Sequence, residues 1–181
     1  MWEPAETLAR WERVPRRLSD DGSARPVWFA LREANADRRF RAPEGNLELR
    51  TQFGLRLVVH ATPRGPHNAI SYSEKLVDGS IAAFHNDRYS PLLLSILAPK
   101  FSGVTEEELR RALDHPVGPL FETPAIRAKQ GFVQISPADE RCRVGELTIR
   151  HDSNSRWPEL SGELFTIRQI DSTKHDENQT G

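Results

Sequence analysis

The chain has 181 residues, of which 37% are apolar and 28% charged, as expected for a folded, soluble protein. Its 25 basic and 26 acidic residues give a net charge of -1, so it lacks the basic excess that neutralises nucleic-acid phosphates. Its single cysteine excludes an internal disulfide, and no apolar run approaches the roughly 20 residues that span a membrane. We therefore expect a cytoplasmic protein with no membrane partner.

The first elements are predicted to be a helix and then strands. Residues 4–18 predict a short amphipathic helix, because Leu8, Trp11 and Val14 recur at three-residue steps. Residues 25–32 are rich in β-forming side chains and predict a mostly buried strand.

The clearest strand covers residues 53–59. Leu55, Leu57 and Val59 alternate with Arg56 and Val58, which is typical of a strand with one buried face. The Pro- and Gly-containing segment that follows predicts an exposed turn.

Residues 73–84 predict the next helix. Ser73 is the expected N-cap, and Glu74, Asp78 and His85 line up on the side opposite the apolar residues. The pattern therefore predicts a polar stripe beside the preceding turn.

Two further helices have clear start signals. Ser90 as N-cap, followed by Pro91, predicts a buried helix that ends before Pro99. Thr105 and Glu108 form the pattern of a capping box, which predicts the beginning of another helix.

Short apolar runs in the last third predict strands. Residues 132–135 and 142–149 predict a hairpin joined by a turn at 136–139, with a bulge at Gly145. A last strand is expected over 164–170.

These elements predict an α+β protein with one domain over residues 1–170. We expect a largely antiparallel, curved sheet covered by three helices, at 74–85, 91–98 and 105–114. Residues 171–181 lack apolar anchors, which predicts a mobile C-terminal tail.

The best candidate site lies where the strand at 53–59 ends beside the helix at 73–84. Histidine titrates near neutral pH, and carboxylates can orient it, so this mixture suits acid-base chemistry. We predict catalytic roles for His67, Asp78 and His85, and substrate-binding roles for His60, Arg64 and Glu74. The spacing fits no standard zinc pattern, so we expect no metal there.

The leading functional hypothesis is a small intracellular enzyme that acts on an anionic small molecule. Arg64 would hold the substrate charge, and His67 or His85 would transfer the proton. The alternative is a non-catalytic protein that docks a protein partner, and a nucleic-acid-binding module is third. The residues leave the reaction and the cofactor open.

Overall fold

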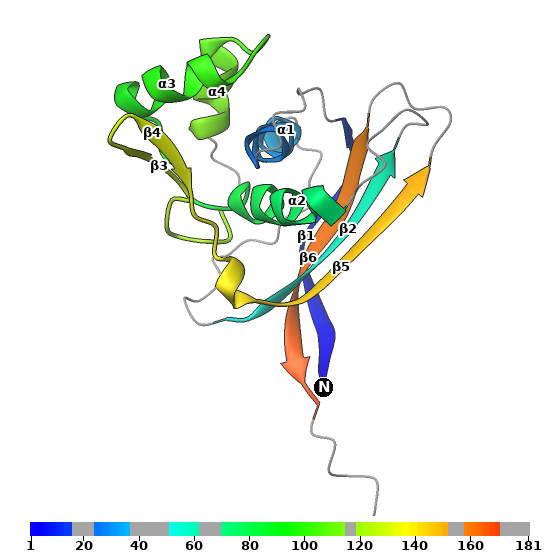
Figure 1. Ribbon diagram of the computed structural model, residues 1–181. Coiled ribbons are helices and arrows are strands. Elements are labelled where there is room, and N and C mark those ends of the chain that lie inside the picture. Colours follow the sequence, from blue (N-terminus) through cyan, green and yellow to red (C-terminus); the bar gives the residue numbers. More distant parts are fainter. Residues whose placement is uncertain (16–23, 37–50, 62–69, 115–118, 152–157, 171–181) are drawn as a thin grey trace, which may run out of the picture.

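The computed structural model describes residues 1–15, 24–36, 51–61, 70–114, 119–151 and 158–170. These residues form two sheets and four α-helices (Figure 1), which confirms the predicted α+β class. No described helix is both long enough and apolar enough to cross a membrane. The predicted tail at 171–181 and the turn containing Arg64 and His67 lie outside the described residues.

The larger sheet has four strands: β1 (Trp2–Pro15), β2 (Phe53–Ala61), β5 (Cys142–His151) and β6 (Glu159–Gln169). The smaller sheet pairs β3 (Ile126–Lys129) with β4 (Phe132–Ile135). The helices are α1 (Arg25–Ala36), α2 (Ile70–Ala82), α3 (Pro91–Leu97) and α4 (Glu106–Leu113). Two short 3-10 helices, Ala98–Lys100 and Asp139–Arg141, complete the described elements.

The strand order in the larger sheet is β1-β6-β2-β5. Strand β6 is antiparallel to both β1 and β2, whereas β2 and β5 are parallel. The sheet is therefore mixed: two of its three strand pairings are antiparallel, in agreement with the prediction of a largely antiparallel sheet, and one is parallel.

The predicted hairpin between β4 and β5 is wrong. Strand β4 pairs instead with β3, through a turn at Gln130 and Gly131 whose φ angles are 49° and 80°. Positive φ at both turn residues is the geometry of a tight type I′ hairpin. The segment predicted as a turn leads into the 3-10 helix Asp139–Arg141, which carries the chain to the larger sheet. The bulge predicted at Gly145 lies two residues earlier on β5: Phe53 and Gly54 pair with Cys142 and Val144, which leaves Arg143 as the extra residue.

The predicted N-terminal helix is wrong, because residues 2–15 form strand β1. The pairing of β1 with β6 shifts register three times, including between Trp11 and Val14. Each bulge adds a residue to β1, so Leu8, Trp11 and Val14 are all buried although they are three residues apart. The bulges thus imitate the spacing of a helix.

The predicted strand at 25–32 is also wrong, because these residues belong to α1. Both sides of this helix are buried: Val27 and Leu31 are covered, and so are Trp28 and Arg32. A helix that is buried all round loses its amphipathic pattern and resembles a buried strand in sequence.

The other helices occur where they are predicted. Ser90 caps α3, Pro91 is its first residue, and Thr105 and Glu108 complete the capping box of α4. Helix α2 begins at Ile70, so Ser73 lies inside it and is not its N-cap. Gly79 lets α2 approach α1, because a Cβ atom there would lie 2.5 Å from the backbone oxygen of Ala24.

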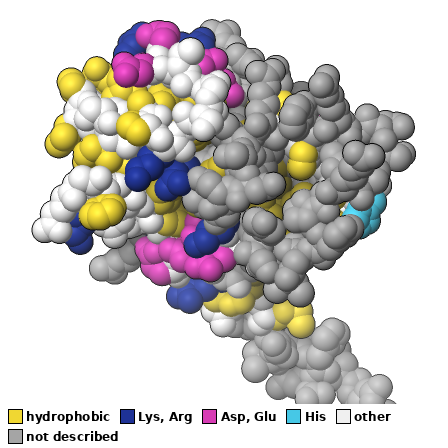
Figure 2. Space-filling view, turned by 45° about the horizontal axis from the view of Figure 1, so that its top comes forward, with side chains coloured by type: hydrophobic (Ala, Val, Ile, Leu, Met, Phe, Trp, Pro, Cys, Tyr) yellow, Lys and Arg dark blue, Asp and Glu magenta, His cyan; other side chains and the backbone are white. Residues whose placement is uncertain are grey.

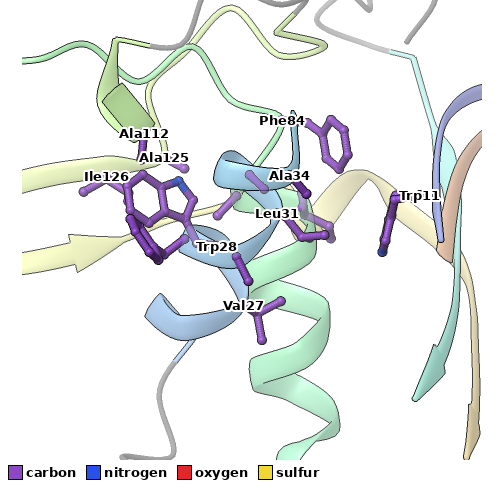
Figure 3. Close-up of a cluster of buried hydrophobic side chains, with 14 of the residues drawn as sticks. Trp11, Val27, Trp28, Leu31, Ala34, Phe84, Ala112, Ala125 and Ile126 are labelled. Atoms are coloured by element: carbon purple, nitrogen blue, oxygen red, sulfur yellow. The ribbon is translucent and has the colours of Figure 1, made fainter. Parts of the chain in front are cut away.

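Of the three helices expected on the sheet, only α2 lies against it, together with α1 (Figure 1). Helix α3 packs against β3, β4 and α4, and α4 also contacts α1. We call the sheet face covered by α1 and α2 the inner face, and the opposite one the outer face. The buried apolar cluster joins the inner face to these helices (Figure 3), with the rings of Trp11 and Phe84 5.5 Å apart.

Candidate functional site

The four described residues of the site predicted from sequence lie in different parts of the structure. His60 is on β2 and points to the outer face, where it contacts Ser161 of β6. Glu74 and Asp78 are on α2, which lies against the inner face. His85 follows the end of α2 and is not part of its polar side.

His85 is held by backbone groups and is only 2% exposed. Its Nδ1 lies 2.7 Å from the carbonyl oxygen of Thr123, to which it donates, and its Nε2 accepts from the amide of Ala138 at 3.1 Å. Burial lowers the pKa of His85 to about 4, so the imidazole is neutral near pH 7. With both ring nitrogens engaged, this geometry suits a structural role better than proton transfer.

Asp87 and Arg32 form a buried pair of charged side chains close to His85. One carboxylate oxygen of Asp87 accepts from the amides of Ala125 and Ile126 at 2.8 and 2.9 Å, and the other from the indole of Trp28 at 3.1 Å. Burial raises the pKa of the Asp87 carboxyl, and the hydrogen bonds and the charge of Arg32 oppose that shift.

The Arg32 guanidinium donates to four backbone carbonyls, those of Ala83, His85, Ala112 and Leu113. It therefore ties α1 to the ends of α2 and α4. Because its donors reach carbonyls inside the protein, Arg32 serves the fold and has no access to a ligand.

Asp78 is half-buried, and Glu74 is exposed. Burial raises the pKa of the Asp78 carboxyl, and the negative charges of Asp139 and Glu74 raise it further. Among the described residues, no group of three or more histidine, cysteine or acidic side chains is placed to hold a metal ion. A role for Asp78 and Glu74 in catalysis or substrate binding stays a prediction.

A row of alternating charge crosses the outer face of the larger sheet. Pairing places Arg10 beside Glu163, Glu163 beside Arg56, and Arg56 beside Glu146, so the row spans all four strands. The Arg56 guanidinium donates to Glu146 at 2.7 Å and also to Glu163. The hydrogen bond with Glu146 is the main reason that the pKa of Arg56 is raised.

On the same face, Ser161 lies one row further along and His60 two rows further. Nε2 of His60 is 3.1 Å from the hydroxyl of Ser161, which also accepts a hydrogen bond from the backbone amide of Arg13 at 2.9 Å. Arg13 sits at the bulge of β1 with a φ of 47°, and its side chain contacts Glu159 at 2.6 Å. Left-handed backbone at a residue other than glycine is uncommon and is enriched near functional sites.

These residues surround an open hollow of about 460 Å³, which we call the outer-face hollow. Its charged lining consists of Arg10, Glu12, Arg13, Arg56, His60, Arg150 and Glu163. Its remaining lining consists of Trp11, Val58, Ser161 and Gly162. This volume is within the range of small-molecule sites, about 300–1,000 Å³. An apolar hollow of about 30 Å³ between α1, α2 and the inner face is much smaller.

Several residues of the outer-face hollow were missed from sequence. Arg10 and Arg13 lie in the segment predicted as a helix, and Ser161 precedes the last strand predicted, at 164–170, although it belongs to β6. The predicted alternation did indicate that Arg56 and Val58 share one face of the strand, and His60 continues that face in the structure. The residues of β1, β5 and β6 that lie beside Arg56, Val58 and His60 could not be predicted, because the sequence does not reveal the order of the strands.

Apolar side chains are exposed at the far end of the molecule from the larger sheet. Leu92 of α3 is 64% exposed and Phe132 of β4 is 71% exposed. Figure 2 shows hydrophobic side chains at the surface on the side where α3 and the β3–β4 hairpin lie. Nothing in the structure shows which molecule would cover them.

Comparison of the chain with protein-family models, with curated proteins and with solved structures gives no match.

Proposed function

We propose that this protein binds an anionic small molecule in the outer-face hollow. The observation that carries the proposal is the lining of this hollow, in which four arginines and His60 accompany two glutamates, Glu12 and Glu163. Guanidinium groups bind carboxylates and phosphates through paired, charge-assisted hydrogen bonds. The abundance of arginine over lysine in the chain agrees with this use.

The position of the hollow supports the proposal. Ion pairs hold Arg13 and Arg56 in place, so much of the conformational entropy of these side chains is lost before a ligand binds. The hollow lies on strands β1, β2, β5 and β6, and side chains on paired strands are positioned more accurately than side chains on loops.

The test is a titration of the ¹⁵N-labelled full chain with citrate at low ionic strength, followed by amide chemical shifts. We expect saturable shifts at Arg10–Arg13, Arg56–His60, Arg150 and Ser161–Glu163. Sodium chloride at matched ionic strength is the control, because non-specific screening would move amides all over the surface. Shifts that citrate and chloride produce alike would refute the proposal.

A second candidate function is catalysis on the same ligand, as the sequence first suggested. It is favoured by His60, a titratable side chain in the lining of the hollow and in contact with the Ser161 hydroxyl. In this version His60 takes the proton-transfer role that the sequence assigned to His67 or His85. Turnover of an anionic metabolite that falls much further in His60→Gln than the affinity for that metabolite does would support it, and an equal fall in both would contradict it.

A further inference from the structure

We propose that the ligand of the outer-face hollow carries a phosphate monoester, and that Arg150, His60 and Ser161 bind its phosphate. This inference rests on the proposed function and deepens it by naming the ligand class and the residues that contact it. The three side chains come from the adjacent strands β5, β2 and β6. All three line the hollow.

Arg150 differs from the other three arginines of the hollow in its ion pairs. Arg10 pairs with Glu12 at 3.4 Å, Arg13 with Glu159 at 2.6 Å, and Arg56 with Glu146 and Glu163. By contrast, Arg150 pairs with no acidic side chain in the described part of the chain. Its guanidinium can therefore bind a ligand anion without first losing a carboxylate partner.

Strand pairing places the three side chains next to one another. His60 and Arg150 are direct partners in the parallel pairing of β2 with β5, so their side chains stand side by side on the outer face. The direct partner of His60 on β6 is Glu159, and Ser161 lies one row away from it, where its hydroxyl is 3.1 Å from Nε2 of His60. A guanidinium, an imidazole and a hydroxyl thus lie close together at one end of the hollow.

The hydrogen bonds of Ser161 leave its proton available to an anion. Its oxygen accepts from the Arg13 amide, and it accepts from His60 as well when Nε2 carries the imidazole hydrogen. Both lone pairs are then occupied, so the hydroxyl hydrogen must point away from both donors. An anion in the hollow would select this tautomer, because it is the one in which Ser161 donates to the ligand.

These donors fit a phosphate better than a carboxylate. One guanidinium fork satisfies a planar carboxylate, whereas a phosphate monoester has three terminal oxygens and a charge near -2 at neutral pH. It can therefore accept from Arg150 and Ser161 at once, while His60 holds the Ser161 hydroxyl in place. The organic part of the ligand would lie toward Val58 and Glu163.

The experiment compares two probes of similar size, glycerol 3-phosphate and succinate, on the full chain. Calorimetry and amide shifts are measured for the wild type, Arg150→Met and Ser161→Ala. We expect glycerol 3-phosphate to bind more tightly than succinate, and Arg150→Met to weaken its binding at least tenfold. Arg127→Met on β3 is the matched control, since it removes the same charge from an exposed residue outside the hollow. It should leave binding unchanged.

The other outcomes separate the two proposals. If neither probe nor citrate shifts the amides of the hollow, the proposed function fails together with this inference. If succinate binds as tightly as glycerol 3-phosphate, or if Arg150→Met and Arg127→Met behave alike, the phosphate assignment is overturned while anion binding stands. Tighter binding of a single-stranded oligonucleotide, whose phosphates are diesters, would overturn the small-molecule class. Unchanged thermal unfolding of each variant excludes misfolding as the cause.

Discussion

The buried Arg32–Asp87 pair and the outer-face hollow both bring charged side chains together. They differ in the groups that form hydrogen bonds and ion pairs with these side chains. Arg32 and Asp87 are each under 4% exposed and are bonded to backbone groups from several elements. In the hollow, side chains pair with other side chains, and Arg150 has no described acidic partner. The first arrangement stabilises the fold, whereas the second leaves hydrogen-bonding capacity for a ligand.

The largest effect should come from Asp87→Ala. It leaves the amides of Ala125 and Ile126 and the indole of Trp28 without their acceptor, and it leaves the buried Arg32 without its counter-charge. We expect a loss of about 3–5 kcal/mol in the free energy of unfolding, measured with urea. Arg150→Met is the comparison and should change this energy by no more than about 0.5 kcal/mol. Equal losses would remove the distinction between the two regions.

The pH dependence of stability should also come from the buried region. The pKa of His85 is 6.5 in the unfolded chain and about 4 in the folded protein, so between these values the unfolded state binds more protons. The contribution of His85 is therefore complete above pH 6.5 and is lost as the pH falls toward 4. At about 1.4 kcal/mol for each pKa unit, it amounts to roughly 3 kcal/mol.

The raised pKa values of Asp78 and Asp87 make stability fall as the pH rises, which is opposite to the contribution of His85. The variant His85→Gln separates the contribution of His85 from theirs. It should be less stable than the wild type at pH 7, and the difference should shrink by pH 4. Urea unfolding at a series of pH values measures it. A difference that does not change with pH would contradict the neutral, doubly bonded state of His85.

A smaller effect is expected from Gly162→Ala in the lining of the hollow. The added Cβ would lie 2.6 Å from the Trp11 ring and 2.7 Å from the backbone oxygen of Arg56, so the backbone must move. We expect the free energy of unfolding to fall by about 1–3 kcal/mol, as it does at other overpacked sites. Gly145→Ala on β5 is the matched control, because a Cβ there meets nothing within 4 Å. A similar result for both would mean that the Trp11 contact can relax.

Local signals in the sequence predicted local structure well. The capping residues Ser90 and Thr105 and the alternation along β2 are confirmed, because each depends only on neighbours in the chain. The failures have tertiary causes. Bulges in β1 gave a strand the spacing of a helix, and burial on all sides of α1 hid its helical period.

The candidate site was less predictable than the fold. The sequence placed His60 correctly at the exposed end of β2 but could not supply its neighbours, because Ser161 and Arg150 are about 100 and 90 residues away in the chain. It also read His85 as a surface group. Only the contacts of His85 with Thr123 and Ala138 show that it is enclosed.

The pairing of β1 with β6 has a consequence for how the protein is made. Trp2 pairs with Gln169, and Met1 donates to the carbonyl of Ile170, so β1 finds its partner only after β6, much later in the chain, has been synthesised. Until then neither edge of β1 is paired, and unpaired strand edges can pair with other chains. In a refolding experiment, closure of this pair should be the late step that depends on contacts most distant in sequence.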